Sequence, residues 1–454
     1  MIVQEISRFD IAGYKDHVFL GAHAYTHNGK TVLHQRSGHT MILEESLFES
    51  IMENRFSDGL IRKLISRGFI HIGEHISESA CEKKYIRPEF FMIDITSECN
   101  LNCEYCLRDV KDKGRHISDK VLYDVCQYVT NYCNDVRLKN VSIQFWGGEP
   151  LLRINSILNA VSWINPTLTK VHYSIETNGT LLTKPMIELL FKNKIGIGIS
   201  VDGNSKIHDK QRKFRNGKPS LNIIERHIRE ALNVYGERIG TITTITKNNM
   251  NVVDDVIGYL GRDLGIRNLK FNFVHDSIFN NCEGITLTED DAAYTQTIIL
   301  NSIVNLNKSG IRVSEYNIKV KLQNLLFLQY SDICLSRGCH GGYKMIVFDM
   351  DGNYFPCELT DILKYRIGSI YDGRDFIESI DKAIENNEYF STVDTSMCQE
   401  CEWYVYCKGG CTIKSLCKKD GENKVDIIEC AVNKTLYPVA TRTQLENIVR
   451  QFCA

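Results

Sequence analysis

The stretch Cys99-Asn100-Leu101-Asn102-Cys103-Glu104-Tyr105-Cys106 is the most informative segment of this sequence. Its three cysteines have the spacing C-x3-C-x2-C, and they follow residues 90–96, whose apolar and β-branched side chains predict a buried strand. Three thiolates can bind three irons of a cubic [4Fe–4S] cluster and leave the fourth iron without a protein ligand. An open position of this kind is typical of a reactive metal centre, whereas structural sites are closed. Taken alone, the spacing leaves a zinc knuckle open as the alternative.

The composition is that of an ordinary globular protein. The chain has 454 residues, of which 43% are hydrophobic and 24% charged, and its formal net charge is −2. The length predicts about three domains, and the charge balance gives no reason to expect a nucleic-acid partner. The first residues lack a signal peptide, and no apolar run reaches the length of a membrane span. We therefore expect a cytoplasmic protein without a membrane partner.

The cysteine content is the exception in this composition. Seventeen cysteines occur in a long chain without a secretion signal, so reduced thiols that bind metal are expected in place of a disulfide framework. Three of them lie within residues 99–106, and most of the others lie between residues 334 and 430. Such clustering favours metal ligands over scattered core thiols.

Residues 1–85 have the pattern of a small separate module. Short strands are predicted at residues 18–22, 31–35 and 40–43. Two helices follow, the second capped by Ser57 and ended by Gly68. These elements suit a winged-helix-like domain, which binds either a peptide, as an added strand, or DNA. We favour a peptide, because no concentrated Lys/Arg face is present.

After residue 86 the sequence alternates between strand and helix patterns. Strands are predicted at residues 90–96, 141–145, 171–175, 195–200, 241–246 and 269–273. Helices are predicted between and after them at residues 118–134, 154–164, 183–193, 220–234, 250–264, 287–308 and 314–328. Repeated βα units predict parallel strands joined by right-handed crossovers. The fold class is therefore α/β, with a partial (β/α)6 TIM-like barrel over residues 86–285 and bridging helices over residues 286–333.

Unusual motifs follow the first four predicted strands. The cysteine stretch follows the first strand, and Gly147-Gly148-Glu149-Pro150 ends the second. Glu176-Thr177-Asn178-Gly179 ends the third, and Ser200-Val201-Asp202-Gly203 ends the fourth. The carboxyl ends of the strands form the active-site rim in barrels of this type, so we expect the four motifs to lie together at one site.

The cysteine spacing, with Tyr105 before the third cysteine and Gly147-Gly148-Glu149-Pro150 after the second strand, resembles the signature of radical S-adenosylmethionine (SAM) enzymes. This resemblance implies that Cys99, Cys103 and Cys106 hold a [4Fe–4S] cluster, and that SAM binds its open iron. It also implies reductive cleavage of SAM to a 5′-deoxyadenosyl radical, with an electron from a flavodoxin or ferredoxin. The cofactor-binding residues implied are Tyr105, Gly147, Gly148, Glu149, Pro150, Glu176, Asn178, Ser200, Asp202 and Arg212. Asp202 is equally explained as a turn residue, and Tyr105 as a packing residue.

The cysteines of residues 334–454 resemble the seven-cysteine SPASM domain of radical SAM enzymes that act on peptides and proteins. Two zinc sites are the alternative, because C-x2-C pairs also build zinc ribbons. The resemblance implies two auxiliary [4Fe–4S] clusters, which makes three in all. The ligands implied for the first are Cys339, Cys357, Cys411 and Cys334, and those for the second are Cys398, Cys401, Cys407 and Cys430. Cys334 lies outside the seven-cysteine pattern and Cys417 competes with it, so the first auxiliary cluster either is closed or has an open iron.

Glu358, directly after Cys357, stands where the related anaerobic sulfatase maturases have an aspartate regarded as a proton acceptor. It is therefore a candidate general base, although a solvated surface glutamate explains it equally well. Together the resemblances imply a maturase that binds the leader of a ribosomally made precursor peptide and forms a thioether, of sactipeptide or ranthipeptide type, or another cross-link. One alternative is a formylglycine-forming sulfatase maturase. Another is a non-enzymatic zinc protein that binds nucleic acid.

Overall fold

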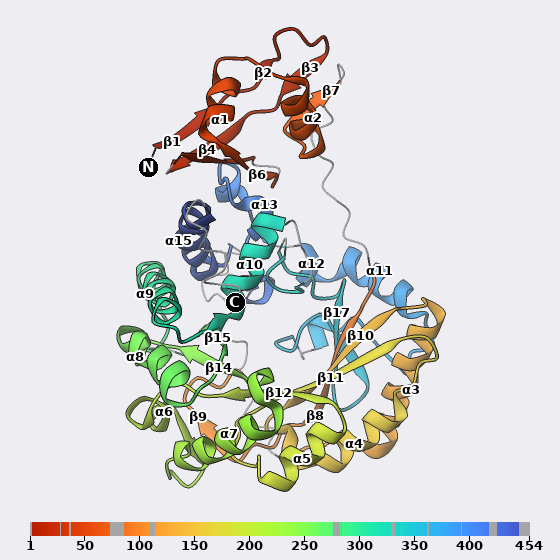
Figure 1. Cartoon of the computed structure of the whole chain (residues 1–454). Coiled ribbons are helices and arrows are strands. Elements are labelled where there is room, and N and C mark those ends of the chain that lie inside the picture. The colour runs from red at the N-terminus through yellow and green to blue at the C-terminus, as the bar shows by residue number, and fades with distance from the viewer. Residues whose placement is uncertain are drawn as a thin grey trace.

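The computed structural model describes residues 2–27, 29–35, 38–72, 86–108, 114–275, 282, 284–327, 332–336, 338–360, 363–391, 393–416 and 425–444. An N-terminal module lies at one end of the molecule, and a large parallel sheet with its helices lies at the other (Figure 1). The cysteine-rich C-terminal segments lie between them (Figure 1). None of the helices in these ranges has the length and apolarity needed to cross a membrane.

The N-terminal module combines two small sheets with two helices. One antiparallel sheet has the order β1-β4-β5-β6, with β1 Ile2–Ile6, β4 Ala22–His27, β5 Lys30–His34 and β6 Thr40–Glu44. The other contains β2 Phe9–Asp10, β3 His17–Phe19 and β7 Ile70–Ile72. The helices are α1 Glu45–Met52 and α2 Asp58–Ser66. The winged-helix arrangement stays a prediction.

Local signals in the module agree with the structure except at one strand. The hydroxyl of Ser57 accepts a hydrogen bond from the Leu60 N–H at 3.3 Å, so the predicted cap of α2 is confirmed. The strand predicted at residues 18–22 is wrong in its extent, because β3 ends at Phe19 and β4 begins at Ala22. Between them Gly21 has φ +80°, and a Cβ there would lie 2.9 Å from the Ile6 carbonyl oxygen. Glycine therefore permits a turn that separates the two strands.

The six strands predicted for the central region are confirmed, and all six are parallel. They pair in the order β8-β10-β11-β12-β14-β15. Their bounds are β8 Phe90–Thr96, β10 Asn140–Gly147, β11 Lys170–Thr177, β12 Ile195–Ser200, β14 Gly240–Ile245 and β15 Asn268–Phe273. Closure into a partial barrel stays a prediction, but the parallel order brings the carboxyl ends of the strands to one edge.

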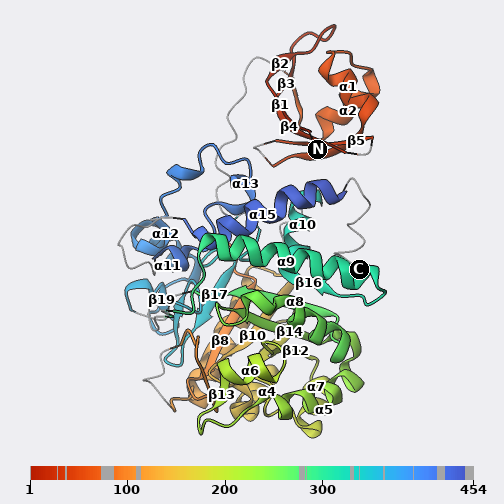
Figure 2. The same cartoon turned by 90° about the vertical axis from the view of Figure 1, so that its left-hand side faces the viewer.

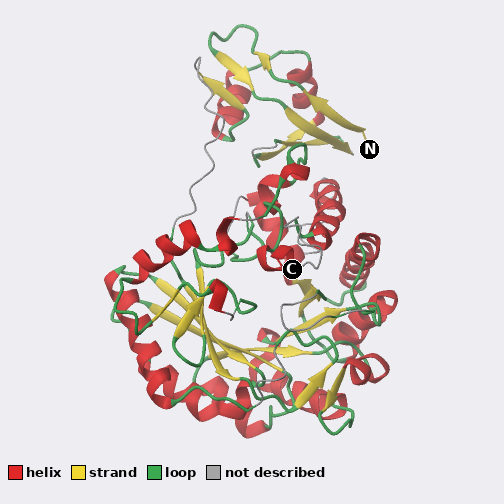
Figure 3. Ribbon diagram, turned by 180° about the vertical axis from the view of Figure 1, so that it is seen from behind, coloured by secondary structure: helices red, strands yellow, loops and turns green. Residues whose placement is uncertain are grey.

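Helices cover the outer face of this sheet (Figures 1 and 3). They are α3 Asp119–Asp135, α4 Ile154–Trp163, α5 Lys184–Lys192, α6 Ser205–Gln211, α7 Leu221–Tyr235 and α8 Val253–Gly258. The single helix predicted at residues 250–264 is wrong, because a 3-10 turn precedes α8 and a π-helix, Tyr259–Asp263, follows it. Gly258 and Gly261 lie in this stretch, and glycine weakens a regular α-helix.

The sheet also extends beyond the predicted barrel region. Strand β17, Met345–Phe348, pairs in parallel with β8 on the side away from β10. It continues through β18 Asn353–Phe355 and β19 Gly368–Ser369, and β16 Ser314–Glu315 pairs with β15 at the other edge. The start of the cysteine-rich region is therefore fixed to the strand that leads into Cys99.

The remaining helices belong to the C-terminal part of the chain. Their bounds are α9 Glu289–Lys308, α10 Tyr316–Phe327, α11 Phe376–Asn386, α12 Glu388–Ser391, α13 Tyr404–Cys407, α14 Thr412–Leu416 and α15 Ile427–Gln444. Figure 2 shows α9 and α15 side by side between the sheet and the N-terminal module. The helix predicted at residues 314–328 begins only at Tyr316, because the two residues before it form β16.

The N-terminal module packs on α13 through His34. The His34 ring stacks on Trp403 at 4.8 Å and on Tyr406 at 5.5 Å between ring centroids. Its Nε2 lies 3.2 Å from the Glu402 carbonyl oxygen, so the neutral ring can donate there. Nearby, the Tyr25 hydroxyl donates to a Glu402 carboxylate oxygen at 2.6 Å. Burial lowers the pKa of His34 to about 4 from its ordinary 6.5.

This shift predicts that docking of the module weakens in acid. Below pH 6.5 the undocked imidazole binds a proton that the docked one does not, so docking stability falls as the pH drops from 6.5 toward 4. At pH 5 the loss should be about 2 kcal/mol. Although Glu402 lies nearby, His23 and His39 oppose the added positive charge. Thermal unfolding at neutral pH and at pH 5 measures the effect, and it should be much smaller in His34→Phe, which keeps a stacking ring but cannot titrate.

Candidate active site

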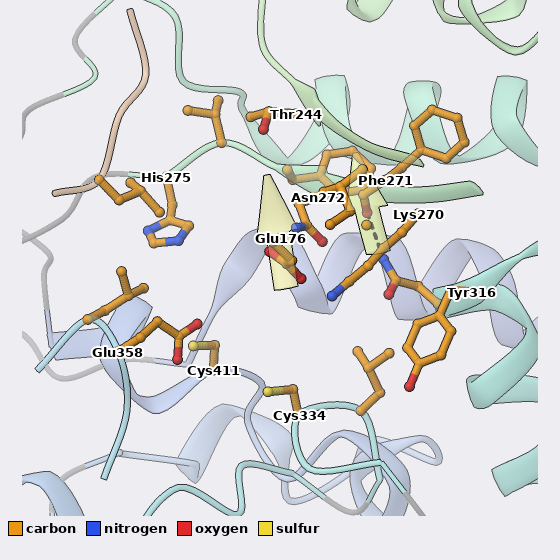
Figure 4. Close-up of a pocket in the computed structure, with 18 of the residues that line it drawn as sticks. Glu176, Thr244, Lys270, Phe271, Asn272, His275, Tyr316, Cys334, Glu358 and Cys411 are labelled. Carbon is orange, nitrogen blue, oxygen red and sulfur yellow. Dashed lines mark hydrogen bonds between the residues drawn. The ribbon is translucent and has the colours of Figure 1, made fainter. Parts of the chain in front are cut away.

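A cavity of about 880 Å³ lies at the carboxyl ends of the parallel strands. Cys99, Cys103 and Cys106 line one part of it, and Cys334 and Glu358 line another (Figure 4). The other predicted site residues that line it are Tyr105, Gly147, Gly148, Glu176, Asn178, Ser200, Arg212, Cys357, Cys407 and Cys411. The structure thus brings residues from all four strand-end motifs and from the C-terminal cysteine block to one cavity.

The two glycines at the end of β10 support the loop that carries Cys99. The Gly148 N–H donates to the Thr96 carbonyl at 2.7 Å. A Cβ on Gly147 would lie 2.3 Å from that same oxygen, and one on Gly148 would lie 2.2 Å from the Glu98 carbonyl oxygen. Neither position therefore accepts a side chain without movement of the loop. Diglycine is needed here for close backbone packing directly behind the first cysteine.

Glu149 and Pro150 lie behind the cavity wall and not among its lining residues. One carboxylate oxygen of Glu149 accepts from the Thr177 hydroxyl at 2.7 Å, and the other accepts from the Asn178 N–H at 2.8 Å. Burial raises the pKa of Glu149, and these hydrogen bonds oppose the rise. Glu149 therefore joins the carboxyl ends of β10 and β11, and its predicted role at the cofactor becomes one of positioning.

Asp202 also lies outside the lining and holds two residues that do line the cavity. Its Oδ2 accepts from the Tyr105 hydroxyl at 2.6 Å, and its Oδ1 accepts from the Thr244 N–H at 3.1 Å. The Arg212 guanidinium donates to the same Tyr105 hydroxyl. All three side chains are buried. Asp202 therefore fixes the orientation of Tyr105 and Arg212 at the cavity wall.

Asn178 reaches the first cysteine directly. Its Oδ1 accepts from the Thr180 N–H at 2.9 Å, which fixes the orientation of the amide. The Nδ2 atom then faces the Asn100 Oδ1 at 2.7 Å and the Cys99 Sγ at 3.7 Å. The Leu101 N–H also points at this sulfur, at 3.4 Å. Two N–H donors on one sulfur fit a thiolate ligand of an iron–sulfur cluster, whose potential depends on such hydrogen bonds.

The Asn178 contact predicts a measurable change in the cluster. In Asn178→Leu, loss of the hydrogen bond should leave more negative charge on Cys99, so the reduction potential of the SAM-binding cluster should become more negative. The electron paramagnetic resonance spectrum of the reduced cluster should change as well. Redox titration of anaerobically reconstituted protein measures the potential. Asn178→Gln, which keeps the amide, is the matched variant, and its reduction potential should lie between those of the wild type and Asn178→Leu. Identical potentials in all three proteins would contradict a hydrogen bond from Asn178 to the Cys99 sulfur.

The Cys103 thiol is protonated in the absence of metal. Burial raises its pKa to about 12, so the thiol keeps its proton at neutral pH unless a bound metal displaces it. Within the described ranges, no three His, Cys, Asp or Glu side chains are arranged to hold one metal ion.

Four C-terminal cysteines form a second group. Burial raises the pKa of the Cys334 and Cys357 thiols, and the nearby thiols of Cys339 and Cys411 raise it further. Cys334 is accessible to solvent and lines the cavity (Figure 4). Cys334 therefore lies with the three cysteines of the predicted first auxiliary set. Its competitor Cys417 lies outside the described residues.

The other predicted auxiliary set also lies together. Cys398, Cys401, Cys407 and Cys430 line one small pocket. Trp403, whose ring the N-terminal module covers, lines the same pocket. The module therefore packs directly against the predicted second auxiliary site.

Two polar groups at the cavity were missed from the sequence. Arg108 lies 2.5 Å from Asp94, and its guanidinium lies 5.9 Å from the Trp146 ring centroid. Lys270 projects from β15 into the cavity with Glu176 among its charged neighbours (Figure 4). The sequence signal for Lys270 was its place next to the buried Leu269. Successive side chains of a strand point to opposite faces, so Lys270 points to the face opposite Leu269, toward the cavity.

Comparison with known proteins finds a family match in the central region and relatives over most of the chain. The model of the radical SAM superfamily matches residues 93–260. The chain is 27% identical over 332 residues to the cysteine-type anaerobic sulfatase-maturating enzyme of Clostridium novyi (strain NT), a match that covers 70% of this chain and 85% of the relative. It is 24% identical over 407 residues to the antilisterial bacteriocin subtilosin biosynthesis protein AlbA of Bacillus subtilis (strain 168), covering 86% and 81%.

A solved structure shares the fold. The native anSMEcpe structure with bound AdoMet and Cp18Cys peptide has a TM-score of 0.67 and 24% identity, and the match covers 80% of this chain and 99% of that one. At this identity the likeness concerns the fold alone. The α/β fold with a mostly parallel central sheet is therefore shared with that structure.

Proposed function

We propose that this protein modifies a ribosomally made precursor peptide by forming a thioether or another cross-link. Residues 93–260 match the radical SAM superfamily, and the chain is related to sulfatase maturases and to a bacteriocin biosynthesis protein. One observation carries the proposal. A single cavity of about 880 Å³ extends from Cys99, Cys103 and Cys106 to Cys334 and Glu358. That volume is at the upper end for small-ligand sites, so it leaves space for a substrate side chain beside SAM.

In this proposal Cys99, Cys103 and Cys106 hold the SAM-binding [4Fe–4S] cluster. When loaded, the cluster and SAM supply a carbon radical that takes hydrogen from an unactivated C–H bond. The backbone at Gly147 and Gly148 lies open to the ligand, and Tyr105 and Arg212 form the wall beside it. Asp202 and Glu149 keep these groups in place. Cys334, Cys339, Cys357 and Cys411 hold one auxiliary cluster, and Cys398, Cys401, Cys407 and Cys430 hold the other.

Glu358 is proposed as the proton acceptor for the substrate. Its Oε2 lies 3.2 Å from the Cys357 sulfur, and the residue lines the cavity. Glu358→Gln should reduce peptide modification by about 10²-fold or more, because a positioned base contributes on this scale. Formation of 5′-deoxyadenosine without coupling to the peptide should persist. Chromatography measures the nucleoside and mass spectrometry the peptide in the same reaction, and parallel loss of both products would argue against a base.

A formylglycine-forming activity is the second candidate. The sulfatase-maturating relative and the carboxylate at Glu358 favour it. The N-terminal module that packs on α13 favours a precursor peptide, because a leader can bind a small domain as an added strand. The length of the match to the bacteriocin protein, 86% of this chain, supports the same reading.

Product analysis tests the proposal. Anaerobically reconstituted protein is supplied with SAM, dithionite and a cysteine-containing precursor peptide encoded beside its gene. A thioether removes two hydrogens from the peptide, whereas formylglycine formation replaces the cysteine thiol by an aldehyde. An aldehyde product would establish the second candidate. Failure to form 5′-deoxyadenosine at full iron content would reject both.

A further inference from the structure

A basic surface lies directly outside the predicted SAM-binding cluster. Strand β13, Arg212–Phe214, pairs antiparallel with β9, Leu101–Cys103, so that Arg212 is opposite Cys103 and Lys213 is opposite Asn102. Successive side chains on a strand point to opposite faces. Arg212 and Cys103 accordingly line the cavity, whereas Lys213 and Asn102 are exposed. This two-stranded ribbon therefore forms the wall of the cavity at Cys103, with one face toward the cavity and the other toward solvent.

The outer side of the wall carries a cluster of positive charge. Five exposed side chains from α6, β13 and the turn after it form the surface, namely Lys206, Lys210, Lys213, Arg215 and Lys218. No ion pair links any of them to another residue within the described ranges. Asp209 is the one acidic residue between residues 204 and 219, and its carboxylate already accepts the Ser220 and Leu221 N–H groups. Glu104 directly follows β9, and its carboxylate accepts a hydrogen bond from the Asn248 amide at 3.2 Å.

The location of this surface is compatible with simultaneous peptide binding. Helix α6 lies in the part of the molecule remote from the N-terminal module in both Figures 1 and 2. Strand β9, labelled in Figure 1, and strand β13, labelled in Figure 2, lie in the same part. A partner at the basic surface would therefore not meet the module. It would be separated from the Cys103 region only by the ribbon.

We propose that this basic surface docks an acidic one-electron carrier protein, a flavodoxin or a ferredoxin. The inference rests on the proposed function, which requires an external electron. In the step concerned, one electron leaves the reduced carrier, which is oxidised, and enters the cluster held by Cys99, Cys103 and Cys106, which is reduced. Opposite charges steer such encounters and set their dependence on salt. A nucleic acid would also be attracted by five cations, but the position over the cysteine loop favours an electron donor.

The test reverses charge at three of these positions in the reconstituted holoenzyme. The variant combines Lys210→Glu, Lys213→Glu and Lys218→Glu. A second variant carries glutamine at the same three positions; it removes the positive charges without adding negative ones, so it tests the surface if the glutamate variant does not fold. The control combines Lys139→Glu, Lys170→Glu and Lys192→Glu, three exposed lysines near the amino ends of the strands. Binding of an acidic flavodoxin is measured by calorimetry at low and high salt. The rate of cluster reduction is followed with flavodoxin hydroquinone and, separately, with dithionite.

The glutamate variant should bind flavodoxin about tenfold or more weakly than the wild type at low salt, and the difference should shrink at high salt. The control should bind as the wild type does, and excess dithionite should reduce the cluster of every protein to the same final extent. Equal flavodoxin affinity in variant and control would overturn the proposal, as would preferential binding of a DNA duplex. A smaller final extent of reduction by dithionite at full iron content would also overturn it, because the lysines would then act on the cluster itself. Absence of SAM cleavage with dithionite in the wild type would instead reject the proposed function.

Discussion

Cys103→Ala should abolish formation of 5′-deoxyadenosine. Cys103 is the middle ligand of the proposed SAM-binding cluster, and it lies in β9, opposite Arg212 in β13. Two remaining thiolates cannot hold three irons of the cube, so the open iron that binds SAM is lost. We expect the rate to fall below detection, by at least about 10³-fold, since removing even outer-shell partners of a metal site costs 10–100-fold. Anaerobic turnover with SAM and dithionite, followed by chromatography of the nucleoside, measures it.

The matched control is Cys126→Ala. Cys126 is a buried thiol on α3 that lines neither the cavity nor the small pocket, and it belongs to the hydrophobic core. This variant should keep its iron and its activity and lose only some stability. The Cys103→Ala protein should still contain the iron of the two auxiliary clusters, because those cysteines lie on other segments. Continued nucleoside formation by Cys103→Ala would show that the cluster assignment is wrong.

The sequence was informative wherever a short-range pattern determines structure. The alternation of strand and helix patterns predicted all six parallel strands, and the order of the motifs predicted that Cys99 and Asn178 would meet at one edge. The extension of the sheet was missed, because pairing of β17 with β8 joins segments some 250 residues apart and no local pattern encodes it. The contact of Asn178 with a sulfur was missed for the same reason, since its amide orientation depends on Thr180 and Asn100 together.

The glutamate of the second motif shows how side-chain geometry refines a role predicted from a motif. Glu149 was predicted to bind the cofactor, yet its carboxylate is satisfied by the Thr177 hydroxyl and the Asn178 N–H. A motif gives residue identity, but only side-chain geometry separates a group that touches a ligand from one that positions its neighbours. The same distinction applies to Asp202, which holds Tyr105.

Removal of residues 1–85 should abolish modification of a leader-bearing peptide and leave SAM cleavage without coupling to the peptide nearly unchanged. The module has a hydrophobic core of its own, which includes Phe19, Leu33 and Phe69. It meets the rest of the chain through His34 on Trp403 and through the Tyr406 hydroxyl, which donates to the Gly38 carbonyl at 2.7 Å. The cavity that contains Cys99 is formed by other segments, so its chemistry should survive the deletion.

The size of the effect follows from tethering. A leader bound to the module holds the reactive part of the peptide near the cavity, and such linkage raises apparent affinity by 10²–10⁴-fold. The truncated protein should therefore modify a leader-bearing peptide at least about 100-fold more slowly at low peptide concentration. On a leaderless peptide, the truncated protein should work at the same rate as the full chain, and this reaction is the control. Loss of SAM cleavage as well would indicate damage to the exposed Trp403 surface, whereas unchanged turnover of the leader-bearing peptide would rule out recognition by the module.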